Sequence, residues 1–215
     1  KFLPIITAGR MASSTLCSKI NALPNCKNFW EAFREGTIIS HPIFKSIKEF
    51  NGKTDHQVKA GSFYPFRHSD DPKKDIIKLC SENNMTEEFI SFKIFTRHLT
   101  PNQVNKLLLP SKDEVKVIFL KRDLKDTYSS LMKAKITSNW GTTPEKQRER
   151  NLEMGVLNVD IEVNFDCNAF RLYANGMNTM FKRTELFCNN NNIPYEIVHF
   201  EDVISDEFDA SKLLF

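Results

Sequence analysis

The chain has 215 residues, of which 40% are hydrophobic and 27% are charged, and its formal net charge is +3. These values are typical of one globular domain, here residues 1–215, and they exclude a disordered or fibrous chain. Lysine and arginine form no basic stripe and no apolar run is long enough to cross a bilayer, so neither a nucleic-acid partner nor a transmembrane segment is expected. An anionic small-molecule ligand remains compatible with the mild basicity.

In chain order, short apolar runs alternate with helical patterns. The runs predict strands at residues 2–7, 89–95, 115–120 and 195–200. The helical patterns predict helices from residue 15 onward and at 75–83, 101–109, 124 to about 135, and 160–189. Two segments are less regular, with broken helical pieces at 28–50 and an irregular loop at 51–71. The alternation predicts an α/β fold with a central parallel sheet of about four or five strands and helices on both faces.

The sequence leaves the cellular compartment open. The chain has five cysteines without a C-x-x-C pair or a zinc-site spacing, and it begins at Lys1 rather than at a methionine. If an N-terminal anchor has been removed, the domain is expected in the Golgi lumen. The glycosylation triplet at residues 84–86 would matter in that compartment. Otherwise a cytoplasmic location is expected. The oligomeric state is not predicted.

The segment after the first predicted strand has the composition of an anion-binding loop. It lies where a parallel strand gives way to a helix N-terminus, a place at which free N–H groups and the helix dipole attract anions. Small residues allow close backbone approach, hydroxyls donate hydrogen bonds, and Arg10 supplies charge. The expected ligand-binding residues are Gly9, Arg10, Met11, Ala12, Ser13, Ser14 and Thr15. A serine-rich helix cap beside an exposed arginine is the alternative interpretation.

This loop differs from the Walker A loop of ATP- and GTP-binding proteins. From Gly9, the pattern G-x-x-x-x-G-K-[ST] would require a glycine and a lysine where the chain has Ser14 and Thr15. The sequence therefore argues against ordinary ATP or GTP chemistry.

A second charged turn follows the most clearly predicted strand. Arg122 comes directly after that strand, and Ser130 lies eight residues further on, within the next predicted helix. An arginine and a hydroxyl in these positions could hold a second anion at the same edge of the sheet. The alternative is a surface pair of Arg122 with Asp123 and a capped helix start.

Together the two segments resemble the sulfotransferase family. Arg10-Met11-Ala12-Ser13-Ser14 is similar to its 5′-phosphosulfate loop, commonly K/R-S-G-S/T-T/S, and residues 120–126 with Ser130 are similar to its 3′-phosphate motif. Residues 200–203 (FEDV) are similar to a segment after the family's last strand. Met11 and Ala12 replace the usual Ser-Gly, and Leu124 replaces the usual Pro.

The resemblance implies a P-loop-type sulfotransferase fold and the transfer of a sulfuryl group from 3′-phosphoadenosine 5′-phosphosulfate (PAPS) to a hydroxyl acceptor, with adenosine 3′,5′-bisphosphate (PAP) as product. Arg10 would stabilise charge on the leaving phosphate, and Arg122 with Ser130 would bind the 3′-phosphate. A sulfuryl group carries less negative charge than a phosphoryl group, and no carboxylate cluster suggests a metal site, so no metal is expected.

Two residues compete for the role of general base. Glu31 follows Arg10 by 21 residues, the spacing of the catalytic carboxylate in carbohydrate and glycolipid sulfotransferases. His98 follows a predicted strand and resembles the catalytic histidine of cytosolic members. Lys93, inside that strand, either points toward the site or extends from the core to solvent.

Three functions are therefore compared. The first is a sulfotransferase acting on a small-molecule or glycan acceptor, with sugars favoured through the Glu31 resemblance. The second is a protein that binds PAP without turnover, which Met11, Ala12 and Leu124 would favour. The third is a kinase-like phosphotransferase, which the missing Walker lysine argues against. The sequence does not identify the acceptor, because variable loops shape acceptor pockets.

Overall fold

The computed structural model of the chain describes residues 1–29, 71–82, 85–95, 101–137 and 165–214. These residues form a five-stranded sheet in which every pairing is parallel. The strands are β1 (Phe2–Thr7), β2 (Cys26–Asn28), β3 (Phe89–Phe95), β4 (Val117–Lys121) and β5 (Tyr195–His199). The α/β fold with a central parallel sheet, predicted from the alternating pattern, is confirmed.

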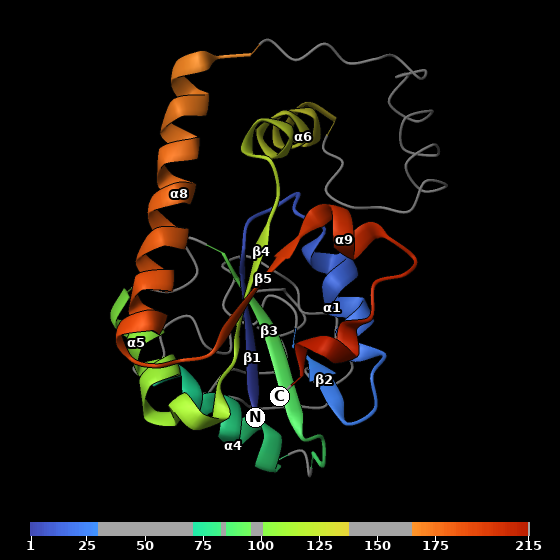
Figure 1. The fold of residues 1–215 in the computed structure, drawn as a ribbon, viewed down its shortest axis with the longest axis vertical. Helices are drawn as coiled ribbons and strands as arrows, with labels where there is room; N and C mark the ends of the chain where they lie inside the picture. The colour runs from blue at the N-terminus through green and yellow to red at the C-terminus, as the bar shows by residue number, and fades with distance from the viewer. Residues whose placement is uncertain (30–70, 83–84, 96–100, 138–164, 215) are drawn as a thin grey trace, which may run out of the picture.

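Helices cover both faces of the sheet (Figure 1). One face carries α1 (Ser13–Asn21), α9 (Phe200–Ile204) and the 3-10 helix η2 (Ala210–Leu213), and α1 contacts β2, β3 and both of these helices. The other face carries α4 (Pro72–Glu82), α5 (Pro101–Leu108) with the 3-10 helix η1 (Leu109–Glu114), and α8 (Cys167–Asn190). Helix α6 (Leu124–Thr137) follows β4 and contacts α8.

The strand order places two loops side by side at the carboxyl ends of the central strands. The order is β2-β3-β1-β4-β5, so the chain leaves β1 toward β2 on one side and leaves β4 toward β5 on the other. Ligands of open parallel sheets bind where neighbouring strands send their connections in opposite directions. The loop after β1 and the loop after β4 meet at this point.

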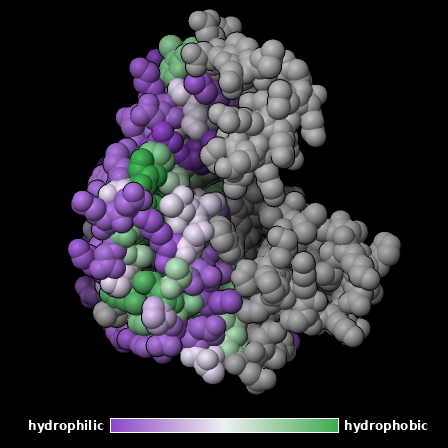
Figure 2. Space-filling model, turned by 90° about the vertical axis from the view of Figure 1, so that its right-hand side faces the viewer, coloured by the Kyte–Doolittle hydropathy of each residue, from purple (hydrophilic) through white to green (hydrophobic). Residues whose placement is uncertain are grey.

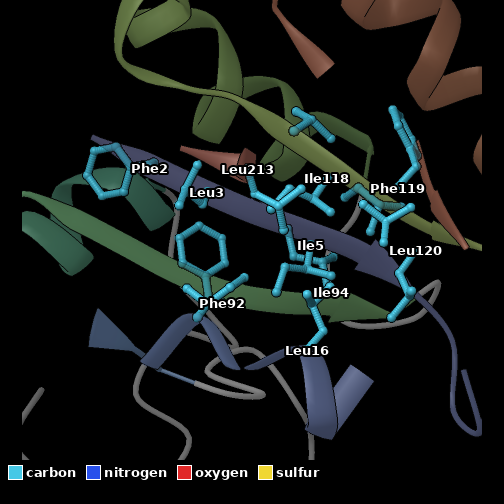
Figure 3. Packing of buried hydrophobic residues seen from close by; sticks show 14 of the residues in the cluster. Phe2, Leu3, Ile5, Leu16, Phe92, Ile94, Ile118, Phe119, Leu120 and Leu213 are labelled. Carbon is cyan, nitrogen blue, oxygen red and sulfur yellow. The ribbon is translucent and has the colours of Figure 1, made fainter. Parts of the chain in front are cut away.

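The core lies along the three central strands (Figure 3). Leu3 and Ile5 of β1, Phe92 of β3 and Phe119 of β4 are fully buried, and Leu16 of α1 packs from one face. Strands covered on both faces bury nearly every side chain, which explains why these runs are mostly apolar; Thr7, Ser91 and Lys93 are the buried polar exceptions within them. The packed strands give the loops at their carboxyl ends a rigid base.

The predicted elements differ from the structure mainly at their ends. Strands β1 and β3 span the predicted residues, whereas β4 starts two residues later than expected and ends at Lys121. The last strand stops at His199, because Phe200 already begins α9. Helical structure was predicted from residue 28 onward, but Asn28 is the last residue of strand β2, so the prediction was wrong there. Residues 30–50 and 51–70 lie outside the described ranges.

The described surface beside α1 and α9 is mostly hydrophilic, with apolar side chains in small groups (Figure 2). Among the residues that the structure describes, no helix combines the length and the apolar character that a membrane span requires.

Candidate anion-binding site

The loop between β1 and α1 is held in an unusual backbone conformation. Arg10 has φ 71° and Ala12 has φ 55°, which places both residues in the left-handed region. This conformation is unfavourable for a residue with a Cβ. Gly9 does not share it, and a Cβ added at Gly9 would meet open space. The tight turn therefore depends on the residues at positions 10 and 12 rather than on the glycine.

Helix α1 begins without a side-chain cap among the residues that the structure describes. Its N-cap residue is Ala12, which has no side chain that could accept a hydrogen bond from the first turn. The first N–H groups of a helix have no partner within the helix, and they carry the positive end of the helix dipole. Ser14 and Thr15 are exposed here, whereas the Ser13 side chain is buried. The serine-rich cap considered as an alternative is not formed at the N-cap.

The second predicted segment contacts this loop directly. Arg10 Nε donates a hydrogen bond to Ser130 Oγ at 3.0 Å, across 120 residues of sequence. Arg122 Nη1 donates to the backbone oxygen of Arg10 at 2.9 Å. The two arginines and Ser130, which the sequence analysis assigned to one ligand from separate motifs, thus form one network.

The two guanidinium groups lie close enough to affect each other. Partial burial lowers the pKa of Arg10, and the positive charge of Arg122 lowers it further. Arg122 Nε is buried without a hydrogen-bond partner. Within the described part of the chain, no carboxylate forms an ion pair with either arginine. An anion bound between them would offset the repulsion and supply an acceptor.

A third cation reaches the same loop from the neighbouring strand. Lys93 of β3 is 3% exposed, and its Nζ donates a hydrogen bond to Ser14 Oγ at 3.2 Å. The same Nζ lies 5.5 Å from the centre of the Phe95 ring. Of the two interpretations of Lys93, the structure supports the one in which its amine points toward the loop. A lysine from β3 therefore approaches the start of α1, where a Walker loop would carry its own lysine.

Phe200 is a site residue that the sequence analysis did not assign. Its ring centre lies 3.8 Å from Arg122 Cζ, so the guanidinium stacks on the ring. Stacking of this kind holds an arginine in place without neutralising it. The FEDV segment at residues 200–203 was noted for its similarity to a family segment, but a stacking role could not be predicted from that similarity.

Asp123 caps the following helix instead of pairing with Arg122. Its Oδ1 accepts hydrogen bonds from the backbone N–H groups of Lys125 and Asp126 at 2.9 and 3.0 Å. The capped helix start that was considered as an alternative is therefore present, but it coexists with an Arg122 that turns toward Arg10. Leu124 is the first residue of α6, a position where proline is favourable but not required.

Among the other predicted site residues, Met11 is described by the structure and the two candidate bases are not. Met11 is fully buried and belongs to the hydrophobic core, so its side chain anchors the loop rather than facing a ligand. Glu31 and His98, the two candidates for the general base, lie outside the described residues. In the described ranges, no group of three or more histidine, cysteine or acidic side chains could hold a metal ion.

The fold and the site define a parallel α/β domain with a cluster of cations at its topological switch point. No family model, no curated protein and no solved structure matches the chain significantly.

Proposed function

We propose that the protein is a sulfotransferase that takes a sulfuryl group from PAPS. The observation that carries this proposal is the hydrogen bond from Arg10 to Ser130, which joins the two anion-binding segments. PAPS bears its 3′-phosphate and its 5′-phosphosulfate on one ribose, so its two anion subsites must be contiguous. A protein that bound two independent anions would have no need for such a connection.

Each subsite has its own set of donors. The first N–H groups of α1, the hydroxyl of Ser14 and the amine of Lys93 would surround the 5′-phosphosulfate. Arg122 and Ser130 would bind the 3′-phosphate, and the unpartnered Arg122 Nε would gain an acceptor. Arg10 stands between the subsites and would contact either anionic group.

The transfer would be an in-line displacement at sulfur. The acceptor oxygen forms a bond to sulfur while the bond between sulfur and the 5′-phosphate oxygen breaks, and PAP leaves. The acceptor's proton passes to a base, for which Glu31 and His98 are the two candidates. Arg10, Lys93 and the α1 N-terminus would stabilise the charge that grows on the leaving oxygen.

The three departures from the family's motifs are compatible with this function. Ala12 adopts the left-handed conformation for which glycine is suited, at some cost in strain. Met11 is directed into the core, away from the ligand side of the loop. Leu124 starts α6 where proline would also fit. The same residues had favoured a binding protein without turnover, and their conformations weaken that argument.

Nucleotide binding is tested first, by calorimetric titration with PAP and with ATP. We expect PAP to bind much more tightly than ATP. Arg122→Gln should weaken PAP binding at least about tenfold, because hydrogen bonds to charged groups contribute about 1.5–3 kcal/mol. Lys125→Gln is the matched control, since it removes an exposed cation from the same segment. Equal affinity for ATP and PAP, or equal effects of the two variants, would contradict the proposal.

Turnover is tested by transfer of radiolabelled sulfate from PAPS onto glycans, glycolipids, phenols and tyrosine peptides. Glu31→Gln and His98→Ala separate the two candidate bases, and the variant that loses transfer while retaining PAP binding identifies the base. Tight PAP binding by the wild type without transfer to any acceptor would favour a binding protein instead.

A further inference from the structure

A cavity of about 420 Å³ that opens to solvent is lined by residues of α5, α8 and the sheet. Helices α5 and α8 cover the sheet face opposite α1 (Figure 1). Ile6 of β1 and Ile94 of β3 line it on the side of the sheet, and Val104 of α5 lines another wall. Pockets that bind small molecules typically have volumes of about 300–1,000 Å³. None of Arg10, Arg122 or Lys93 lines this cavity; Phe95, whose ring centre lies 5.5 Å from Lys93 Nζ, lines it on the side nearest the anion-binding site.

Two neighbouring stripes of residues on α8 face the sheet side: one is buried in the core, and the other lines the cavity. Met177, Phe181 and Cys188 are the buried residues of α8. The Phe181 ring packs edge-to-face on Phe119 of β4, with 6.2 Å between the ring centres. This stripe fixes α8 over β4. The next stripe around the helix then faces the space above β1 and β3.

That second stripe contains two residues that do not suit a helix packed on a sheet. Its members line the cavity at helical spacing, and they are Gly176, Met180, Arg183 and Phe187. An amphipathic helix would carry large apolar side chains at all such positions. Here a glycine and an arginine stand in two of the four.

Gly176 leaves space that no protein atom fills. A Cβ added at Gly176 would have no atom within 4 Å other than those of its own helix. Glycine is a poor residue for a helix interior, by about 1 kcal/mol relative to alanine. Gly176 is exposed and lines the cavity, so it borders the side of the cavity that opens to solvent, where a larger side chain would project into the open space.

Arg183 gives the cavity a positive charge at its solvent side. The residue is exposed and also lines the cavity. No ion pair links it to a carboxylate in the part of the chain that the structure describes. Thr179 and Asn105 add polar groups to the lining. The apolar floor and the cationic side together favour a ligand with two different ends.

We propose that this cavity binds an amphipathic monoanion, with its hydrocarbon body against Ile6 and Ile94 and its anionic head beside Arg183. A carboxylate on an aliphatic chain has the required chemistry. The proposal does not depend on the sulfotransferase function, because the cavity uses none of the residues assigned to the nucleotide.

Decanoate and decanol are the probes for a calorimetric titration of the full chain. Wild type is expected to bind decanoate, and Gly176→Leu is expected to bind it at least about tenfold more weakly because the leucine fills the cavity. Gly176→Ala is the matched control, since one methyl group occupies little of the space. Asn105→Leu fills the cavity from α5 and tests the same prediction if Gly176→Leu fails to fold.

The charge is tested at two adjacent positions of α8. Arg183→Gln should weaken the binding of decanoate about tenfold and leave the affinity for decanol unchanged. Lys182→Gln should change the affinity for neither probe. Binding of PAP to Gly176→Leu should equal that of the wild type, which separates this site from the nucleotide site. Failure of both probes to bind wild type, or equal decanoate affinity in Gly176→Leu and wild type, would overturn the proposal.

Discussion

Replacement of Ala12 by glycine tests the backbone conformation on which the anion-binding loop depends. Ala12 has φ 55° and ψ 23° at the N-cap of α1, and its side chain makes no capping hydrogen bond. A left-handed conformation costs a residue with a Cβ roughly 1–2 kcal/mol, whereas glycine adopts it without that cost. The strain is expected to be released in the Ala12→Gly variant.

The gain is reduced by the unfolded state. Glycine makes the unfolded chain more flexible, which offsets about 0.4–1 kcal/mol of the released strain. The free energy of unfolding should therefore rise by about 0.5–1 kcal/mol. For a chain of this length, a gain of about 1 kcal/mol corresponds to an increase in Tm of roughly 2–4 °C.

Ala174→Gly is the matched control because it makes the same chemical change inside a regular helix. Ala174 lies in the middle of α8, where glycine should lower the free energy of unfolding by about 1 kcal/mol. Urea unfolding followed by circular dichroism measures both variants. If Ala12→Gly destabilises the protein as much as Ala174→Gly does, Ala12 is not in the left-handed region and the description of the loop is wrong.

Three further predictions concern side chains of the described residues. Ser130→Ala removes the acceptor for Arg10 Nε and should weaken PAP binding about tenfold by calorimetry, whereas Ser129→Ala should not. Lys93→Met removes the charge of this buried side chain and largely keeps its volume, so Tm should change by only a few degrees. The affinity for PAP should fall more than about tenfold. An unchanged affinity for PAP would exclude Lys93 from the site. Burial, and secondarily the charge of Glu185, raises the pKa of Cys188 from 9.0 to about 12. Between these two pH values the unfolded chain loses the thiol proton while the folded protein keeps it. The free energy of unfolding should therefore fall as pH rises from 9 toward 12. Urea unfolding at several pH values should show a shallower decline in Cys188→Ala, and a decline as steep as that of the wild type would contradict this assignment; the exposed Cys167 provides the control variant.

The central strands could be predicted because their signal is local. Residues 2–7 are apolar up to Thr7, and residues 89–95 are apolar except for Ser91 and Lys93, as expected of strands buried on both faces; the structure has β1 and β3 at those residues. Strand β2 could not be predicted in this way. Its residues, Cys26–Asn28, form no apolar run, and they are extended because they pair with β3 in parallel register.

The candidate site was predictable in its parts but not in its arrangement. The loop at Arg10 and the turn at Arg122 each carry a composition that indicates anion binding, and each follows a predicted strand. Neither the stacking of Phe200 on Arg122 nor the approach of Lys93 to Ser14 follows from sequence spacing, because the partners come from separate elements.

The sequence by itself determined the alternation of strands and helices, the buried character of the strands, and the two polar turns at strand ends. Periodicity and turn composition act over a few residues, so they are legible in one sequence. Only the tertiary structure decided that β1 and β4 are neighbours with connections that diverge. That strand order brings Arg10 Nε within 3.0 Å of Ser130 Oγ, and it arises from the packing of the whole sheet rather than from any short segment.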